Sequence, residues 1–311
     1  MTAVTPPAAP SEMAAGARQA EDRGLLAEIG AAIRRDYLAV AGLTFLTILV
    51  FVAIFGASLA PYDPGEIIRG TDGKVAVLRP PSSEFPLGTT ALGRDVFSQM
   101  LVGARPVVIV GFVCALIPTI FGYILGLMAG YLRGGFDSFI SRLVEVAHAI
   151  PADPFAIVLL SVMSPTLGTL ILAISLTYWK RPTRTVRNLV LTLNESAFVK
   201  ASRIAGARSA WIMLRHMAPL TLPLAFVYVP IGFANAVLAE ASLSFLGFGD
   251  PTLISWGGIM RDAFNGGALS SGWWWVVPPG IAITVTAASM YLVTRPLEEV
   301  IDPRLRSGGA R

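Results

Sequence analysis

Four ionisable side chains stand in or beside apolar segments of the chain: Glu145, His148, Asp153 and Glu240. Charged groups are costly in hydrocarbon and usually face protein or water, so each is a candidate for a functional role. Glu240 can bond Ser242, Ser244 or a backbone amide, because buried polar groups normally need partners. Asp153 lies between two prolines, where it would line water at a helix break or cap the broken helix.

Motifs for catalysis are missing. A P-loop needs G-x-x-x-x-G-K-[ST], but among the lysines only Lys74 follows a glycine, and Val75 comes next. There is no G-x-S-x-G elbow and no H-E-x-x-H zinc motif. The single cysteine, Cys114, excludes an internal disulfide and a cysteine metal cluster. We therefore expect no catalytic site, no bound metal and no cofactor on this chain.

A basic, amphipathic stretch at 195–219 interrupts the apolar sequence. Small and apolar groups recur at helical spacing from Phe198 to Ala205. Gly206 can end that helix, since glycine accepts the left-handed conformation of a helix stop. A second helix at about 209–217 would then lead to Pro219. Two interpretations of this helix–turn–helix remain open: a docking site for another protein, or an amphipathic helix lying on a membrane surface.

The elements that must position these residues are apolar spans. The chain is 54% hydrophobic and 14% charged, whereas soluble domains carry about 25% charge. The first span has 24 residues, about 36 Å of helix, enough to cross a hydrocarbon core of about 30 Å. Glycines 122, 126 and 130 form a small-residue seam for close helix approach. Six spans are predicted, at about 37–60, 105–130, 140–163, 167–179, 220–245 and 273–294.

The distribution of lysine and arginine predicts the orientation. Most of the 24 lie in the segments that share a side with the N-terminus, which therefore faces the cytoplasm, as does the C-terminus. We expect a flexible tail at 1–36, a membrane domain at 37–306 and a short tail at 307–311. Within the domain, 61–104 would be extracytoplasmic and 180–218 cytoplasmic.

Four separated motifs resemble the C-type permeases for dipeptides, oligopeptides and nickel, found in bacterial ABC importers. Residues 238–249 (LAEASLSFLGFG) are similar to the L-A-E-A-S-L-S-F-L-G-L-G run of that family. Residues 251–257 resemble P-x-x-x-S-W-G, and 87–98 resemble L-G-T-D-x-L-G-R-D-V-F-S with Thr90 in place of the aspartate. Residues 301–305 resemble the closing D-P-R-L. The resemblance covers about 37–306.

The polar stretch resembles the permease signature E-A-A-x-x-x-G, which is followed nine residues later by I-x-L-P. Lys200, Ala201 and Ser202 take the first three places, Gly206 the glycine and Pro219 the proline. Lysine replaces the family's acid, and serine replaces the second alanine. Two interpretations of Lys200 stay open: it meets an acidic or carbonyl-lined part of an ATPase groove, or it is simply solvated.

The resemblance implies an all-α, MetI-like permease with six transmembrane helices in the bacterial inner membrane. Its partners would be a second, B-type permease, two ATPase subunits that bind ATP and magnesium, an extracytoplasmic solute-binding protein and membrane lipid, with no nucleic acid. The solute would be a di- or oligopeptide, with nickel, glutathione or haem as alternatives. The residues expected to couple to the ATPase are Phe198, Val199, Lys200, Ala201, Ser202, Gly206, Ala207 and Pro219.

Two further sites follow from the resemblance. Glu240, Ser242 and Ser244 are gate candidates near the outer mouth, although a purely structural hydrogen-bond hub is the alternative. Arg94 and Asp95 should begin the helix of the second span, and they are candidates for contact with the binding protein. An ion-coupled secondary transporter is the rival from another class, but it would need inverted repeats, and the two halves show no obvious match.

Overall fold

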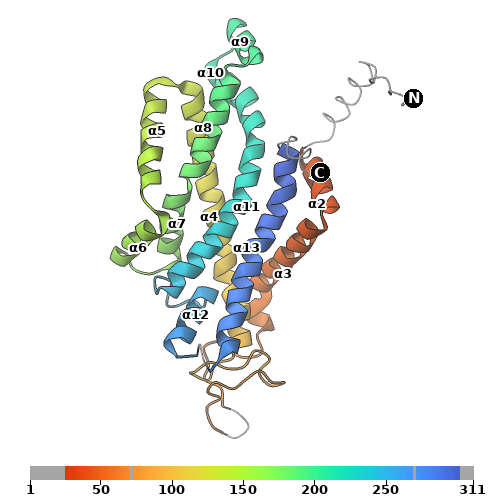
Figure 1. Cartoon of the computed structure of the whole chain (residues 1–311), viewed down its shortest axis with the longest axis vertical. Helices are drawn as coiled ribbons and strands as arrows, with labels where there is room; N and C mark the ends of the chain where they lie inside the picture. The colour runs from red at the N-terminus through yellow and green to blue at the C-terminus, as the bar shows by residue number, and fades with distance from the viewer. Residues whose placement is uncertain (1–24, 70–72, 269–270, 302–311) are drawn as a thin grey trace, which may run out of the picture.

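The computed structural model describes residues 25–69, 73–268 and 271–301, which form helices joined by loops, with two isolated β-bridges and no strand among them. Four helices are long and apolar enough to cross a membrane: α3 (Tyr37–Leu59), α4 (Val96–Leu132), a continuous run over Ser209–Phe245, and α13 (Trp273–Ile301) over Trp273–Glu298. The run Ser209–Phe245 comprises α10 (Ser209–Ile212), a π-helical segment (Met213–Met217) and α11 (Ala218–Phe245). These long helices extend side by side in Figure 1.

The expected third span is broken. Helices α5 (Gly134–Ala149) and α6 (Ala152–Val162) meet at 86°, because Pro151 between them cannot continue a helix. Asp153 lies in the first turn of α6, where the positive end of the helix dipole stabilises a carboxylate. The ammonium of Lys180 donates to the carbonyls of Ala147 and Ile150 at 2.7 and 3.2 Å, which satisfies the open end of α5.

The fourth span is longer than the predicted 167–179. Helix α7 (Leu167–Tyr178) is followed, after Trp179 in helical conformation, by α8 (Lys180–Asn194). The polar composition of 180–194 suggested a loop, yet this segment forms a helix whose apolar side packs on α4. With α7–α8 counted as one unit and α5–α6 as another, the arrangement is compatible with six spans.

The glycine seam of α4 is a close helix contact, as predicted, and its partner is α8 with the preceding Trp179. A Cβ on Gly122, Gly126 or Gly130 would stand 2.4, 2.6 or 2.7 Å from the carbonyl oxygens of Trp179, Thr183 or Arg187. The two backbones are therefore in direct contact along two turns, as small residues allow between membrane helices.

Opposite ends of the helix bundle carry different structures. Helix α9 (Ala197–Ile204) and α10 lie at one end, on the side where α2 (Leu25–Arg35) begins and α13 finishes (Figure 1). Helix α12 (Trp256–Asn265) and the segment before α4 lie at the other end. Trp274 fastens that segment to α13 by donating its indole N–H to the carbonyl of Thr89 at 3.2 Å.

Candidate functional site: the α8–α10 arm

The predicted helix–turn–helix is confirmed. Helix α9 ends at Ile204, and α10 begins at Ser209. Gly206 has a φ of +80°, and its N–H donates to the carbonyl of Arg203 at 3.0 Å. No atom lies within 4 Å of the place its Cβ would take. The glycine is required by its left-handed backbone and not by crowding.

Val199 fixes α9 to the bundle. Its side chain is fully buried in a cluster that joins four elements. The other buried members of this cluster are Leu127, Tyr131, Val186, Val190, Ile212 and Met217. Val199 was expected among the residues that meet an ATPase, but its burial makes it an anchor of α9 instead.

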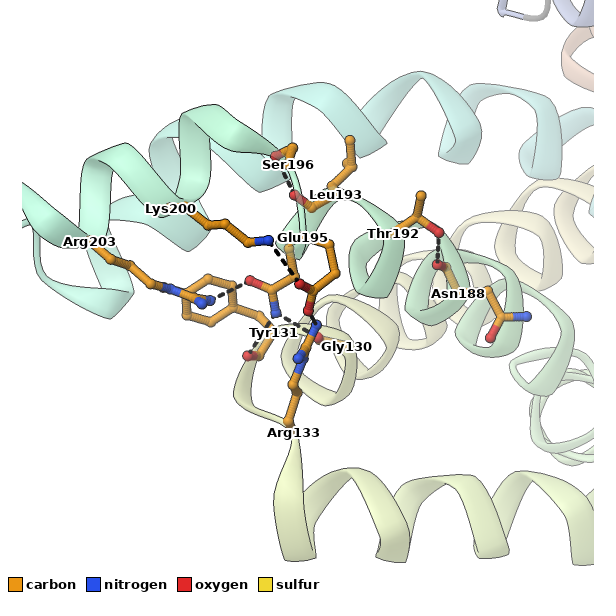
Figure 2. A network of polar contacts seen from close by, with 11 residues as sticks. Gly130, Tyr131, Arg133, Asn188, Thr192, Leu193, Glu195, Ser196, Lys200 and Arg203 are labelled. Atoms are coloured by element: carbon orange, nitrogen blue, oxygen red, sulfur yellow. Dashed lines mark hydrogen bonds and ion pairs between the residues drawn. The ribbon is translucent and has the colours of Figure 1, made fainter.

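A buried amide adds a polar anchor (Figure 2). Asn194 is 1% exposed, and its Nδ2 donates to the carbonyls of Gly130 and Tyr131 at 3.2 and 3.3 Å. Its Oδ1 accepts from the guanidinium of Arg203, which also lies 5.7 Å from the centre of the Tyr131 ring. The last carbonyls of α4 are thereby tied to α8 and α9.

Glu195 joins two cations at the same corner (Figure 2). Its carboxylate lies 2.5 Å from Nη2 of Arg133, which follows α4, and 3.3 Å from Nζ of Lys200 on α9. Hydrogen bonds from Arg133 and then Lys200 lower the pKa of Glu195. Lys200 is therefore paired within the chain, which neither of the two sequence-based interpretations included.

The outward side of the arm carries large apolar side chains beside exposed basic ones. Ile204 is 88% exposed at the end of α9, and Leu214 is 64% exposed. Phe198 and Trp211, both well exposed, each make an edge contact with the ring of His216. Among the expected coupling residues Lys200, Ala201, Gly206 and Pro219 are exposed, and Ser202 and Ala207 are half-buried. The sequence interpretation missed Ile204, Trp211 and Leu214, because it selected this stretch for its charge. Large apolar side chains within a basic stretch were the signal that could have identified them.

At the opposite end, Glu240 is buried, and its Oε1 accepts from the hydroxyl of Ser244 at 2.7 Å. Its Oε2 is buried without a hydrogen bond of normal geometry in the described structure, although the Ser255 hydroxyl lies close to the carboxylate. Ser242 is exposed and bonds only the carbonyl of Leu238 in its own helix. The structure thus brings Ser244 to Glu240 and leaves Ser242 apart.

Asp95 begins α4, as predicted. Its Oδ2 accepts from the backbone N–H and the hydroxyl of Ser98 at 2.8 and 2.7 Å. Asp95 is fully buried, so it caps the helix and offers nothing to a second protein.

Arg94 is half-buried and lines a small pocket with Asp250 and Arg261. Hydrogen bonds from Thr252, and more weakly from the backbone of Leu167, lower the pKa of Asp250.

Two parts of the chain match models of known protein families. Residues 122–307 match the family model described as the binding-protein-dependent transport system inner membrane component. Residues 24–81 match the N-terminal TM domain of oligopeptide transport permease C.

Three curated relatives extend over most of the chain. The dipeptide transport system permease protein of Escherichia coli K12 is 36% identical, over 88% of this chain and 91% of that protein. Its counterpart in Bacillus subtilis is 34% identical, over 88% and 84%. The oligopeptide transport system permease protein of Bacillus subtilis is 31% identical, over 88% of each chain.

Proposed function

The chain belongs to the binding-protein-dependent transport system inner membrane components, and from this membership we propose that it forms half of the pathway of an ATP-driven peptide importer. As a member of this family it is an ABC transport permease and not a catalytic subunit. The proposed solutes are di- and oligopeptides, which the names of the relatives support.

Coupling to a cytoplasmic ATPase would occur through α9. The observation that carries this proposal is that α9 is held by the buried Val199 and by a bond from Arg203 to the buried Asn194 of α8, while its apolar Ile204 and Phe198 are exposed. Helix α9 stands at the extreme end of the molecule (Figure 1). A helix that lay on the membrane surface would instead bury its apolar side at the boundary of the lipid headgroups. The geometry favours docking into a groove of a partner protein.

The partners in this proposal are a second, B-type permease, two ATPase subunits that hold ATP and magnesium, and an extracytoplasmic binding protein. The complex would lie in the bacterial inner membrane with both termini of this chain in the cytoplasm. Arg94, half-buried at the other end of the bundle, stays a candidate for contact with the binding protein, and Glu240 with Ser244 a candidate for the outer gate.

A movement of the ATPases would be passed on by the anchors of α9. Glu195 links α9 to Arg133 at the start of α5, and Asn194 links it to the end of α4. Helix α8 then continues the contact along the glycine seam of α4. Such a rigid connection suits a mechanism in which packed helices move as units between inward-open and outward-open states.

The test is an Ile204→Asp variant in the complete transporter, purified with its co-expressed neighbours and reconstituted. Placing an unpaired charge in a docking groove should cost about 1–3 kcal/mol, which is about 5- to 150-fold in ATPase association, and ATP-dependent peptide uptake should fall with it. The matched control is Ile67→Asp, since Ile67 is also exposed but lies in the segment before α4 at the far end.

Uptake should remain normal in the control. Normal uptake and ATPase recovery with Ile204→Asp would contradict coupling through α9. Uptake by this chain alone, driven by an ion gradient, would instead support the secondary-transporter alternative.

A further inference from the structure

A polar pocket of about 320 Å³ opens between α5 and α8. Its polar lining comes from Ser141, Glu145 and His148 on α5 and from Thr183, Arg184, Arg187 and Asn188 on α8. The volume falls at the lower end of the range of small-molecule sites, about 300–1,000 Å³. The functional site at α9 makes no use of these side chains.

The pocket lies at a level where the outside of the bundle is apolar. Gly126 of α4 packs on the carbonyl of Thr183, so the next residue, Arg184, is level with this part of α4. Phe121 and Ile124 are exposed there, within the apolar span. Charged groups at such depth face protein or a water-filled cavity. The α5–α8 face is thus unsuited to lipid.

Two opposite charges in the pocket, Glu145 and Arg184, make no ion pair among the described residues, although Glu145 lies near enough to Arg187 to interact with its charge. The guanidinium of Arg187 is taken by Asp137, which accepts from its Nε and from its Nη2, the latter at 2.9 Å. Within the described structure, the side chains of Glu145 and Arg184 make no ion pair, with each other or with any other residue. Their N and O atoms are thus more than 4.0 Å apart, which leaves room for a ligand between them.

His148 supplies an imidazole ring beside them. One ring nitrogen, Nδ1, lies 2.8 Å from the carbonyl of Val144 and must donate to it, which leaves Nε2 as an acceptor in the neutral ring. The pocket therefore offers one carboxylate and one guanidinium that make no ion pair in the described structure, together with uncharged hydrogen-bonding groups such as Ser141 and Asn188. This set matches a small zwitterion and does not match a simple anion or cation.

We propose that the α5–α8 pocket is a binding site on the transport route for the charged ends of a short peptide. Glu145 receives the α-ammonium group, and Arg184 receives the α-carboxylate, for which a guanidinium offers paired donors. Asn188 and Ser141 line the pocket beside these two charges. The assignment rests on the proposed transport function and adds to it a position and a preference for free termini.

The test uses thiol labelling in the complete transporter, reconstituted in liposomes. The one native cysteine, Cys114, is buried, so the background is low. Asn188→Cys reports from α8, and Ser141→Cys reports independently from α5. A charged methanethiosulfonate should label both. Alanylalanine at about ten times its dissociation constant should slow labelling about tenfold, by simple occupancy. The N-acetyl, C-amide derivative of the same dipeptide should give no protection.

Two controls make the result specific. Thr192→Cys lies one turn beyond Asn188 on an exposed part of α8 outside the pocket, so peptide should not protect it. Adding Glu145→Gln or Arg184→Gln to a reporter should abolish protection while the labelling rate without peptide stays unchanged. That unchanged rate shows that the pocket itself is intact.

Other outcomes overturn the site. Reporters that never react in the assembled transporter would show that the second permease seals this face and pairs with its charges. Reporters that react without protection would show a merely solvated surface. In both cases normal uptake of alanylalanine keeps the proposed function, and only the site fails. A transporter that takes up no peptide overturns the proposed function and the site with it.

Discussion

At the scale of single residues, Glu195 and Asn194 explain how an exposed arm is held in place. Asn194 is buried and bonds two carbonyls of α4, whereas Glu195 is exposed and ties Arg133 to Lys200. Exposed ion pairs usually contribute little to stability. The hydrogen-bonded amide and the buried Val199 therefore hold α9, and Glu195 adjusts the position of its first turn.

The charge on Glu195 gives a pH prediction. Its pKa is lowered from 4.5 by Arg133 and Lys200. Because the pKa of Glu195 is lower in the folded chain, its ion pairs stabilise the fold fully above the ordinary pKa of 4.5. This stabilisation is lost as the pH falls through the lower pKa of the folded chain. A nitroxide on the exposed position of Ala201→Cys should become more mobile in that acidic window. The electron paramagnetic resonance spectrum of the nitroxide measures this mobility directly.

The matched control is Glu195→Gln, which cannot carry the charge. With this change the nitroxide should be as mobile at neutral pH as the unchanged chain is in acid, and it should show no transition. A transition that persists in Glu195→Gln would assign the effect to another group.

At the scale of elements, the contact of α4 with α8 decides where the arm stands. Three glycines bring the backbones together, and Val186 and Val190 are fully buried against them. The same contact turns the charged side of α8 toward α5, where the polar pocket lies. Helix α8 is thus apolar toward α4 and polar toward α5.

A methyl group at the seam should separate these helices. Gly126→Ala would place its Cβ 2.6 Å from the carbonyl of Thr183, a backbone atom that cannot move aside cheaply. We expect a loss of about 1–3 kcal/mol of stability, typical of overpacking, measured by thermal unfolding of the purified protein. Gly135→Ala in α5 is the control, because nothing lies within 4 Å of its Cβ. Equal stabilities of the two variants would refute the close contact.

At the scale of the whole molecule, one end of the bundle carries the projecting α9 and the other end is closed by loops and α12. The arm at α9 shares its end with the start of α2 and the finish of α13, while α12 and the segment before α4 share the other (Figure 1). The positive-inside rule predicts that the end with the arm faces the cytoplasm.

Labelling in intact cells tests that orientation. Ser83→Cys lies on an exposed position at the α12 end, and Ala201→Cys on an exposed position of the arm. A membrane-impermeant maleimide should react with the first in spheroplasts and with the second only after permeabilisation. The unchanged chain, whose Cys114 is buried, serves as the blank. Reversed accessibilities would mean the opposite orientation.

The sequence by itself determined the class of the molecule, the long apolar spans, the glycine seam, the turn at Gly206 and the helix start at Asp95. Each of these depends on composition or on residues close together in the chain, so local chemistry suffices. The relatives then confirmed the permease family that the four motifs indicated.

Only the tertiary structure decided which side chains meet. It showed that Val199 and Asp95 are buried and that Lys200 pairs with Glu195. It also showed that Glu145 faces a pocket shared with Arg184, 39 positions further along the chain. The polar composition of 180–194 suggested a loop, but this segment is a helix. Its few apolar residues stabilise the helix only because they pack on α4, which the local sequence does not reveal. Burial and pairing are set by contacts between distant segments, and no local pattern specifies those.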